Sequence, residues 1–204
     1  MIARIATLKI PPMPFLLKFV DIRSYIFTTT FILMSIMLPF VFHQFHLAGP
    51  TYLPMHVFVL LAGLLFGWRA GLIVGVFSPL ASQALSGMPA PTVLPQTVVE
   101  LSVYGIVAGL LREKSHLRVV WSLLGAMISG RLCSLLVTSL LFLVTGESNS
   151  PLGVESTPLL ALWSVVKQGW PGIVIQVGSL PILVRLIESF TTRHRGSRHE
   201  QRYI

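Results

Sequence analysis

Three ionisable side chains lie inside long apolar stretches of this 204-residue chain: Glu100, Arg131 and Lys167. A charged residue at the centre of a membrane helix costs roughly 2.5 to 3.5 kcal/mol on the mildest scale. All three are therefore expected to line one cavity rather than to face lipid. One carboxylate against two cations leaves a surplus positive charge, which a monoanionic ligand would neutralise. The alternative is a structural charge network that only ties helices together.

Other polar and aromatic residues extend this candidate site. Tyr104 follows Glu100 by four residues and shares its helix face. His56 begins an apolar run, and Met88 lies in a stiff apolar loop, Gly87-Met88-Pro89, suited to a lid. Two further candidates, Gln168 and Trp170, follow Lys167 directly. The predicted substrate-binding residues are His56, Met88, Glu100, Tyr104, Arg131, Lys167, Gln168 and Trp170.

The histidines offer a second kind of chemistry. His43 and His46 are three residues apart and His56 follows ten residues later, a spacing that could bring three imidazoles to one metal ion. That loop holds no carboxylate or thiol, and we expect neither a metal nor a cofactor. A membrane enzyme or metal-binding subunit that uses these histidines stays open as an alternative.

Catalytic motifs are absent from the sequence, which has no Walker lysine motif, no HExxH and no serine context of an intramembrane protease. We therefore expect a protein that is not an enzyme. Since there is no nucleotide site either, active transport would need a partner or an ion gradient.

The elements that position these residues are apolar and helical in character. The chain is 53% hydrophobic and 11% charged, against about 25% charged in soluble domains. About 20 apolar residues at 1.5 Å each span a bilayer. Six runs approach this length: 25–42, 54–66, 70–85, 95–111, 119–144 and 158–187. We predict an all-α integral membrane protein, a six-transmembrane-helix bundle, although runs two and three also fit a re-entrant hairpin. Pro171 and Pro181 predict a kink in the last helix.

The distribution of basic residues predicts orientation. Lys and Arg occur in both tails, at Arg69 and between Arg112 and Arg118, whereas the loops 43–53, 86–94 and 145–157 have none. By the positive-inside rule both termini are cytoplasmic and these three loops face outward. The net charge of +8 then reflects topology, and we expect no nucleic acid partner. The predicted organisation is a basic tail at 1–24, either an interfacial helix or irregular, one membrane domain at 25–187, and a basic tail at 188–204.

Three pieces of sequence together resemble a known family. GPTYLPMHVFVLLAGLLFGWRAGLIVG, SGMP and ELSVYGIVAGLL, within residues 25–187, are similar to the substrate-binding S components of energy-coupling-factor (ECF) vitamin transporters. The resemblance implies a helical bundle in a bacterial-type cytoplasmic membrane that captures a vitamin-like small molecule. It also implies docking on a transmembrane coupling subunit driven by paired ABC ATPases. The pieces PMH and GMP look most like the branch that includes pantothenate carriers.

One family feature is missing from the first span. The family often presents an alanine-x-x-x-alanine pattern there to the coupling subunit, whereas this chain reads TTTFILMSIMLPF. Either Thr28, Thr29 and Ser35 serve as the small residues, or docking differs, or the chain works alone. A stand-alone secondary transporter of small solutes is therefore the first alternative.

Overall fold

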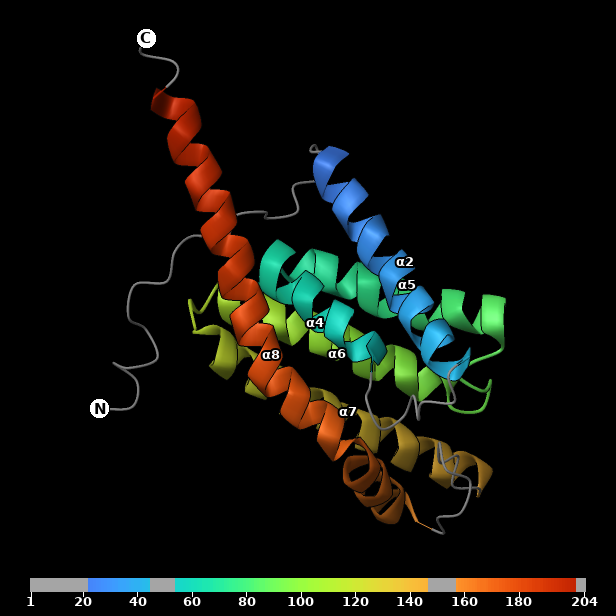
Figure 1. The fold of residues 1–204 in the computed structure, drawn as a ribbon. Helices are drawn as coiled ribbons and strands as arrows, with labels where there is room; N and C mark the ends of the chain where they lie inside the picture. Colours follow the sequence, from blue (N-terminus) through green and yellow to red (C-terminus); the bar gives the residue numbers. More distant parts are fainter. Residues whose placement is uncertain (1–21, 45–53, 147–156, 201–204) are drawn as a thin grey trace, which may run out of the picture.

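The computed structural model describes residues 22–44, 54–146 and 157–200, and these residues form helices and no strand. Figure 1 shows the helices α2 (Ile22–Gln44), α4 (Pro54–Phe66), α5 (Trp68–Ser86), α6 (Leu94–Glu113), α7 (Val119–Thr145) and α8 (Pro158–Glu200). The prediction of an all-α fold is confirmed, and each of the six predicted apolar runs corresponds to one helix. The predicted interfacial helix in the amino-terminal tail lies outside the described residues.

Three of these helices are long and apolar enough to cross a bilayer. They comprise Leu94–Glu113, Val119–Val144 and Pro158–Ser189, and the shorter apolar helices are Tyr25–Leu38 and Pro54–Phe66. The short second run is α4, and Gly67 alone joins it to α5. Gly67 has φ of 90°, in the region that glycine adopts without steric cost, so the chain reverses within one residue.

Glycines bring α4, α5 and α6 into close contact. Gly71 of α5 and Gly105 of α6 lie backbone to backbone, and a Cβ on either residue would overlap the other's main chain. A Cβ on Gly63 would come within 2.5 Å of the Gly105 carbonyl oxygen, and one on Gly75 within 2.7 Å of the Leu101 carbonyl oxygen. Small residues at four-residue spacing allow such approach of membrane helices. This three-helix unit fixes α6, which carries Glu100.

Helix α2 packs against the same unit and uses its small polar residues to do so. Ser35 donates a hydrogen bond of 2.5 Å to Ser78 of α5, and the ring centroid of Phe31 lies 5.3 Å from that of Phe66. Thr28 and Ser35 are buried and Thr29 is exposed. Two of the three small residues considered for docking thus pack inside the bundle.

Helix α8 is the longest helix and runs along one side of the bundle, beyond which its C-terminal part extends (Figure 1). Its N-terminal part changes direction relative to the straight remainder, as its prolines predict. An ion pair between the buried Arg112 and the partly buried Glu188 joins the end of α6 to α8. The helix continues to Glu200, so most of the predicted basic tail is helical.

Candidate ligand-binding site

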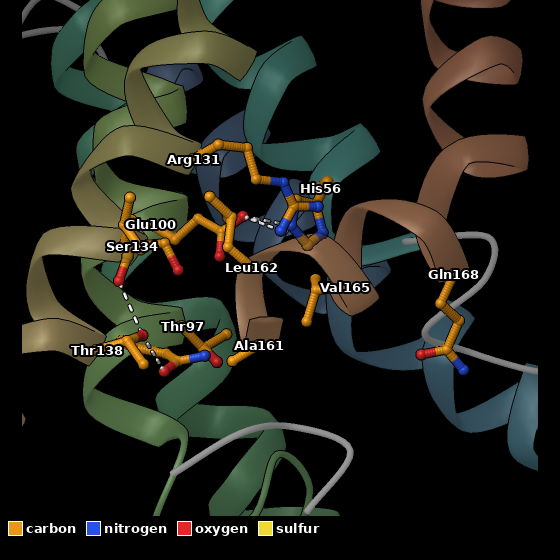
Figure 2. Close-up of a pocket in the computed structure, with 12 residues that line it drawn as sticks. His56, Thr97, Glu100, Arg131, Ser134, Thr138, Ala161, Leu162, Val165 and Gln168 are labelled. Carbon is orange, nitrogen blue, oxygen red and sulfur yellow. Dashed lines mark hydrogen bonds and ion pairs between the residues drawn. The ribbon is translucent and has the colours of Figure 1, made fainter. Parts of the chain in front are cut away.

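A pocket of about 120 Å³ lies between α4, α6, α7 and α8. Figure 2 shows the side chains that surround it. Its lining consists of His56, Gln96, Thr97, Glu100, Arg131, Ser134, Leu135, Thr138, Ala161, Leu162, Val165 and Gln168. Side chains of four helices thus converge on one cavity.

The centre of the pocket is a buried carboxylate. Glu100 Oε1 lies 2.8 Å from Arg131 Nη1 and accepts a hydrogen bond of 2.9 Å from the Tyr104 hydroxyl. His56 Nε2 is 3.8 Å from the same oxygen (Figure 2). A buried carboxylate requires partners of this kind, because removal from water is costly for a charge. All three contacts involve Oε1, and Oε2 receives none of them.

Several buried polar atoms beside this carboxylate have no hydrogen-bond partner among the described residues. Arg131 Nε and Nη2 and His56 Nδ1 are buried and lack a hydrogen-bond partner among the described residues. A buried polar atom left unpaired costs about 1 to 3 kcal/mol, and more when the group is charged. Arg131 lines the pocket, and its guanidinium therefore keeps unused donor capacity at the pocket wall.

The remaining walls differ in polarity. Thr138 donates a hydrogen bond of 2.8 Å to Gln96 Oε1, which joins α7 to α6, and its hydroxyl also lies 2.9 Å from the Ser134 carbonyl oxygen. Helix α8 contributes mainly apolar side chains, Ala161, Leu162 and Val165. A ligand would meet polar groups on α6 and α7 and an apolar surface on α8.

Five of the eight predicted site residues belong to this region. His56, Glu100, Arg131 and Gln168 line the pocket, and Tyr104 is buried behind it with its hydroxyl on Glu100. These positions agree with the expectation that ionisable residues of different spans share one cavity.

Three predicted residues lie elsewhere. Lys167 is exposed, Trp170 is 59% exposed and Met88 is 47% exposed, and none of them lines the pocket. At about 100° per residue, Lys167 and Trp170 fall nearly opposite the α8 face that carries Val165 and Gln168. The expectation that Lys167 shares the cavity with Glu100 and Arg131 is therefore corrected. One carboxylate faces one cation there, and the surplus positive charge is not found in the pocket.

Four polar pocket residues were not predicted from the sequence: Gln96, Thr97, Ser134 and Thr138. The sequence feature that could have identified them is their spacing from the charged residues on the same helices. Gln96 precedes Glu100 by four positions, and Ser134 and Thr138 follow Arg131 by three and seven, so each set shares a helix face.

The histidine cluster cannot be assembled from the described residues. His46 lies outside them, and nothing is described of the His43 side chain. Among the described residues no group of three or more His, Cys, Asp or Glu side chains is placed to hold a metal ion.

Comparison with known proteins identifies the family. Residues 24–184 match the family described as ECF transporter, substrate-specific component. The chain belongs to this family. Neither the curated proteins nor the solved structures contain a match. The predicted resemblance is confirmed. This ECF substrate-specific component is a membrane protein that belongs to a transport system. The pocket between its four helices is its candidate substrate site.

Proposed function

We propose that this protein is the S component of an ECF-type ABC importer, which captures a vitamin or related micronutrient from outside the cell. The observation that carries the proposal is the pocket at Glu100 and Arg131, a cavity among four helices beside which two buried N–H groups of Arg131 have no partner among the described residues. A helical bundle that only anchored other proteins would have no use for such groups, since each costs stability. Family membership supplies the transport context.

Six membrane spans with both termini in the cytoplasm complete the proposal. The pocket residues of α6 and α8 lie in the first turns of those helices, next to the loops that lack Lys and Arg. The Arg112 and Glu188 pair lies toward the other end of the same helices. By the positive-inside rule the pocket then opens toward the outside of a bacterial-type plasma membrane.

We propose that partner proteins drive the release of the ligand into the cell. The chain has no nucleotide-binding motif, so we propose a transmembrane coupling subunit and paired ABC ATPases as the source of energy. Thr28 and Ser35 are occupied inside the bundle, which supports a docking surface other than those small residues. A pantothenate-like anion as the substrate is supported only by the resemblance of the pieces PMH and GMP. The charge argument for an anion does not apply, because Lys167 is exposed and adds no positive charge to the pocket.

Native mass spectrometry of the gently purified protein tests the first half of this proposal. We expect a co-purified adduct of vitamin-like mass, which is lost from a Glu100→Gln/Arg131→Gln double variant that removes both charges together. A protein that carries no small molecule after expression in rich medium, and binds none from a vitamin mixture, would contradict a capture function.

Reconstitution into liposomes tests the second part of the proposal, that transport is driven by the coupling subunit and the ATPases. Liposomes that contain the chain alone should bind the identified ligand without concentrating it. Liposomes that also contain the coupling subunit and ATPases should accumulate it when ATP is present inside. ATP-independent uptake by the chain alone would instead establish a secondary transporter.

A further inference from the structure

The charges around the pocket restrict what it can bind. Glu100 and Arg131 lie 2.8 Å apart and their formal charges cancel. A carboxylate that entered would be attracted by Arg131 and repelled by Glu100 at nearly the same distance, and it would still lose its hydration. An ammonium group would meet the reverse problem. The pocket therefore favours an uncharged ligand group, provided that it is the substrate site proposed above.

The unpaired atoms define the hydrogen-bonding edge of that group. Arg131 Nε and Nη2 are donors that need an acceptor, because a guanidinium cannot accept a hydrogen bond. Glu100 Oε2 takes none of the contacts that converge on Oε1 and can accept a donor. A neutral group that offers a carbonyl oxygen next to an N–H satisfies both residues.

Size and wall polarity describe the body attached to this edge. An engineered protein cavity of about 150 Å³ holds benzene, and this pocket has about 120 Å³. It therefore encloses no more than about one ring. The apolar side chains Leu135, Leu162 and Val165 supply a surface against which the face of a ring can pack.

We propose that the pocket encloses an uncharged planar amide or lactam group of the ligand, and that this group distinguishes substrates. The carbonyl oxygen accepts from Arg131, the N–H donates to Glu100, and the adjoining ring packs against the α7 and α8 side chains. Any further part of the ligand extends outward along α6 past Gln96 and Thr97. This inference rests on the proposed capture function and adds the charge class of the ligand to it.

A series of matched ring compounds tests the proposal on the purified full-length protein in detergent. Benzamide has both the carbonyl and the N–H, N,N-dimethylbenzamide has only the carbonyl, and benzoate has the same shape with a negative charge. Isothermal titration calorimetry should give a benzamide dissociation constant about tenfold or more below those of the other two. Tighter binding of benzoate, equal binding of all three, or no binding at millimolar concentration would overturn the proposal.

Variants assign the preference to the two residues. The Glu100→Leu/Arg131→Met double variant keeps the pocket uncharged overall but removes both the acceptor and the donors, and it should lose benzamide binding while it retains the helical circular dichroism of the parent. Lys167→Met is the matched control, because it removes a cation that lies outside the pocket, and it should leave all three affinities unchanged. Retention of the benzamide preference by a folded double variant would remove these residues from the recognition.

The outcomes separate this inference from the proposed function. Preference for benzoate, together with a co-purified anionic adduct, would refute the uncharged ligand and leave the capture function intact. Absence of any co-purified or added ligand would refute both.

Discussion

Gly130 of α7 leaves the space that the ring of Tyr104 occupies, since a Cβ on Gly130 would overlap Cδ1 and Cε1 of that ring. The ring centroid of Tyr104 in turn lies 5.2 Å from that of His56, and its hydroxyl is bonded to Glu100. A residue without a side chain on one helix thus sets the position of the hydroxyl that holds the central carboxylate.

Substitution Gly130→Ala should displace Tyr104 and weaken ligand binding by about tenfold, because Glu100 loses a hydrogen bond. The measurement is titration of the co-purified ligand into the ligand-free protein. Gly125→Ala is the control, since its Cβ would meet only the flexible end of Leu111. Unchanged affinity in Gly130→Ala would show that the ring can move without effect on Glu100.

Substitution Gly105→Ala should lower the stability of the bundle by about 1 to 3 kcal/mol, as an overpacked core does. The added methyl group overlaps the backbone of Gly71, which cannot move aside as a side chain can. Thermal unfolding in detergent provides the measurement. Gly178→Ala, where no atom lies within 4 Å of the new Cβ, should unfold at or above the parental temperature. Equal behaviour of the two variants would argue against a tight α5–α6 contact.

Substitution Glu188→Gln should destabilise the protein by about 3 to 5 kcal/mol, because it leaves the Arg112 guanidinium buried without its carboxylate. The double variant Arg112→Met/Glu188→Met should recover most of that loss. Denaturant titration measures both, with Glu113→Gln as the control at a neighbouring, partly exposed carboxylate. Ligand affinity should not change in the folded protein, since the pair lies outside the pocket; a large change would reveal coupling between the two ends.

Substitution Thr138→Val should cost about 1 to 3 kcal/mol of stability, because the isosteric side chain removes the donor to the buried Gln96 carbonyl oxygen. Thr138→Ser, which keeps the hydroxyl, should restore most of it. Chemical unfolding of the three proteins distinguishes loss of the hydrogen bond from loss of the methyl group. If the serine variant were the less stable of the two, packing rather than the α6–α7 hydrogen bond would be the cause.

The helices were predictable because apolar length is a direct requirement of the bilayer. The four runs at 54–66, 70–85, 95–111 and 119–144 match their helices to within a few residues at either end, whereas α8 continues well past the end of the run 158–187, to Glu200. Glu100 and Arg131 were predictable for the converse reason, because a charge in such a run must be paired or enclosed.

The orientation of residues around α8 was not predictable in the same way. Depth along a helix follows from the rise per residue, but the side of the helix on which Lys167 lies depends on how α8 packs. Residues 158–189 are apolar on average, and their few polar residues are spread around the helix, so no single polar stripe indicates the inward face. Gln96 and Thr138 were not predicted as site residues because they are uncharged. Burial of an uncharged polar side chain in a membrane helix costs little free energy, so the sequence does not distinguish such residues from others.

Division of the pocket between a polar α6–α7 side and an apolar α8 side has a consequence for engineering. The polar residues are carried by helices anchored through the glycine contacts and the Gln96 hydrogen bond, whereas Ala161, Leu162 and Val165 all belong to one face of α8. Ligand shape can therefore be retuned by exchanging aliphatic side chains on α8 while the hydrogen-bonding preference is retained. Libraries confined to this one helix face are the shortest route to a binder for a new ring.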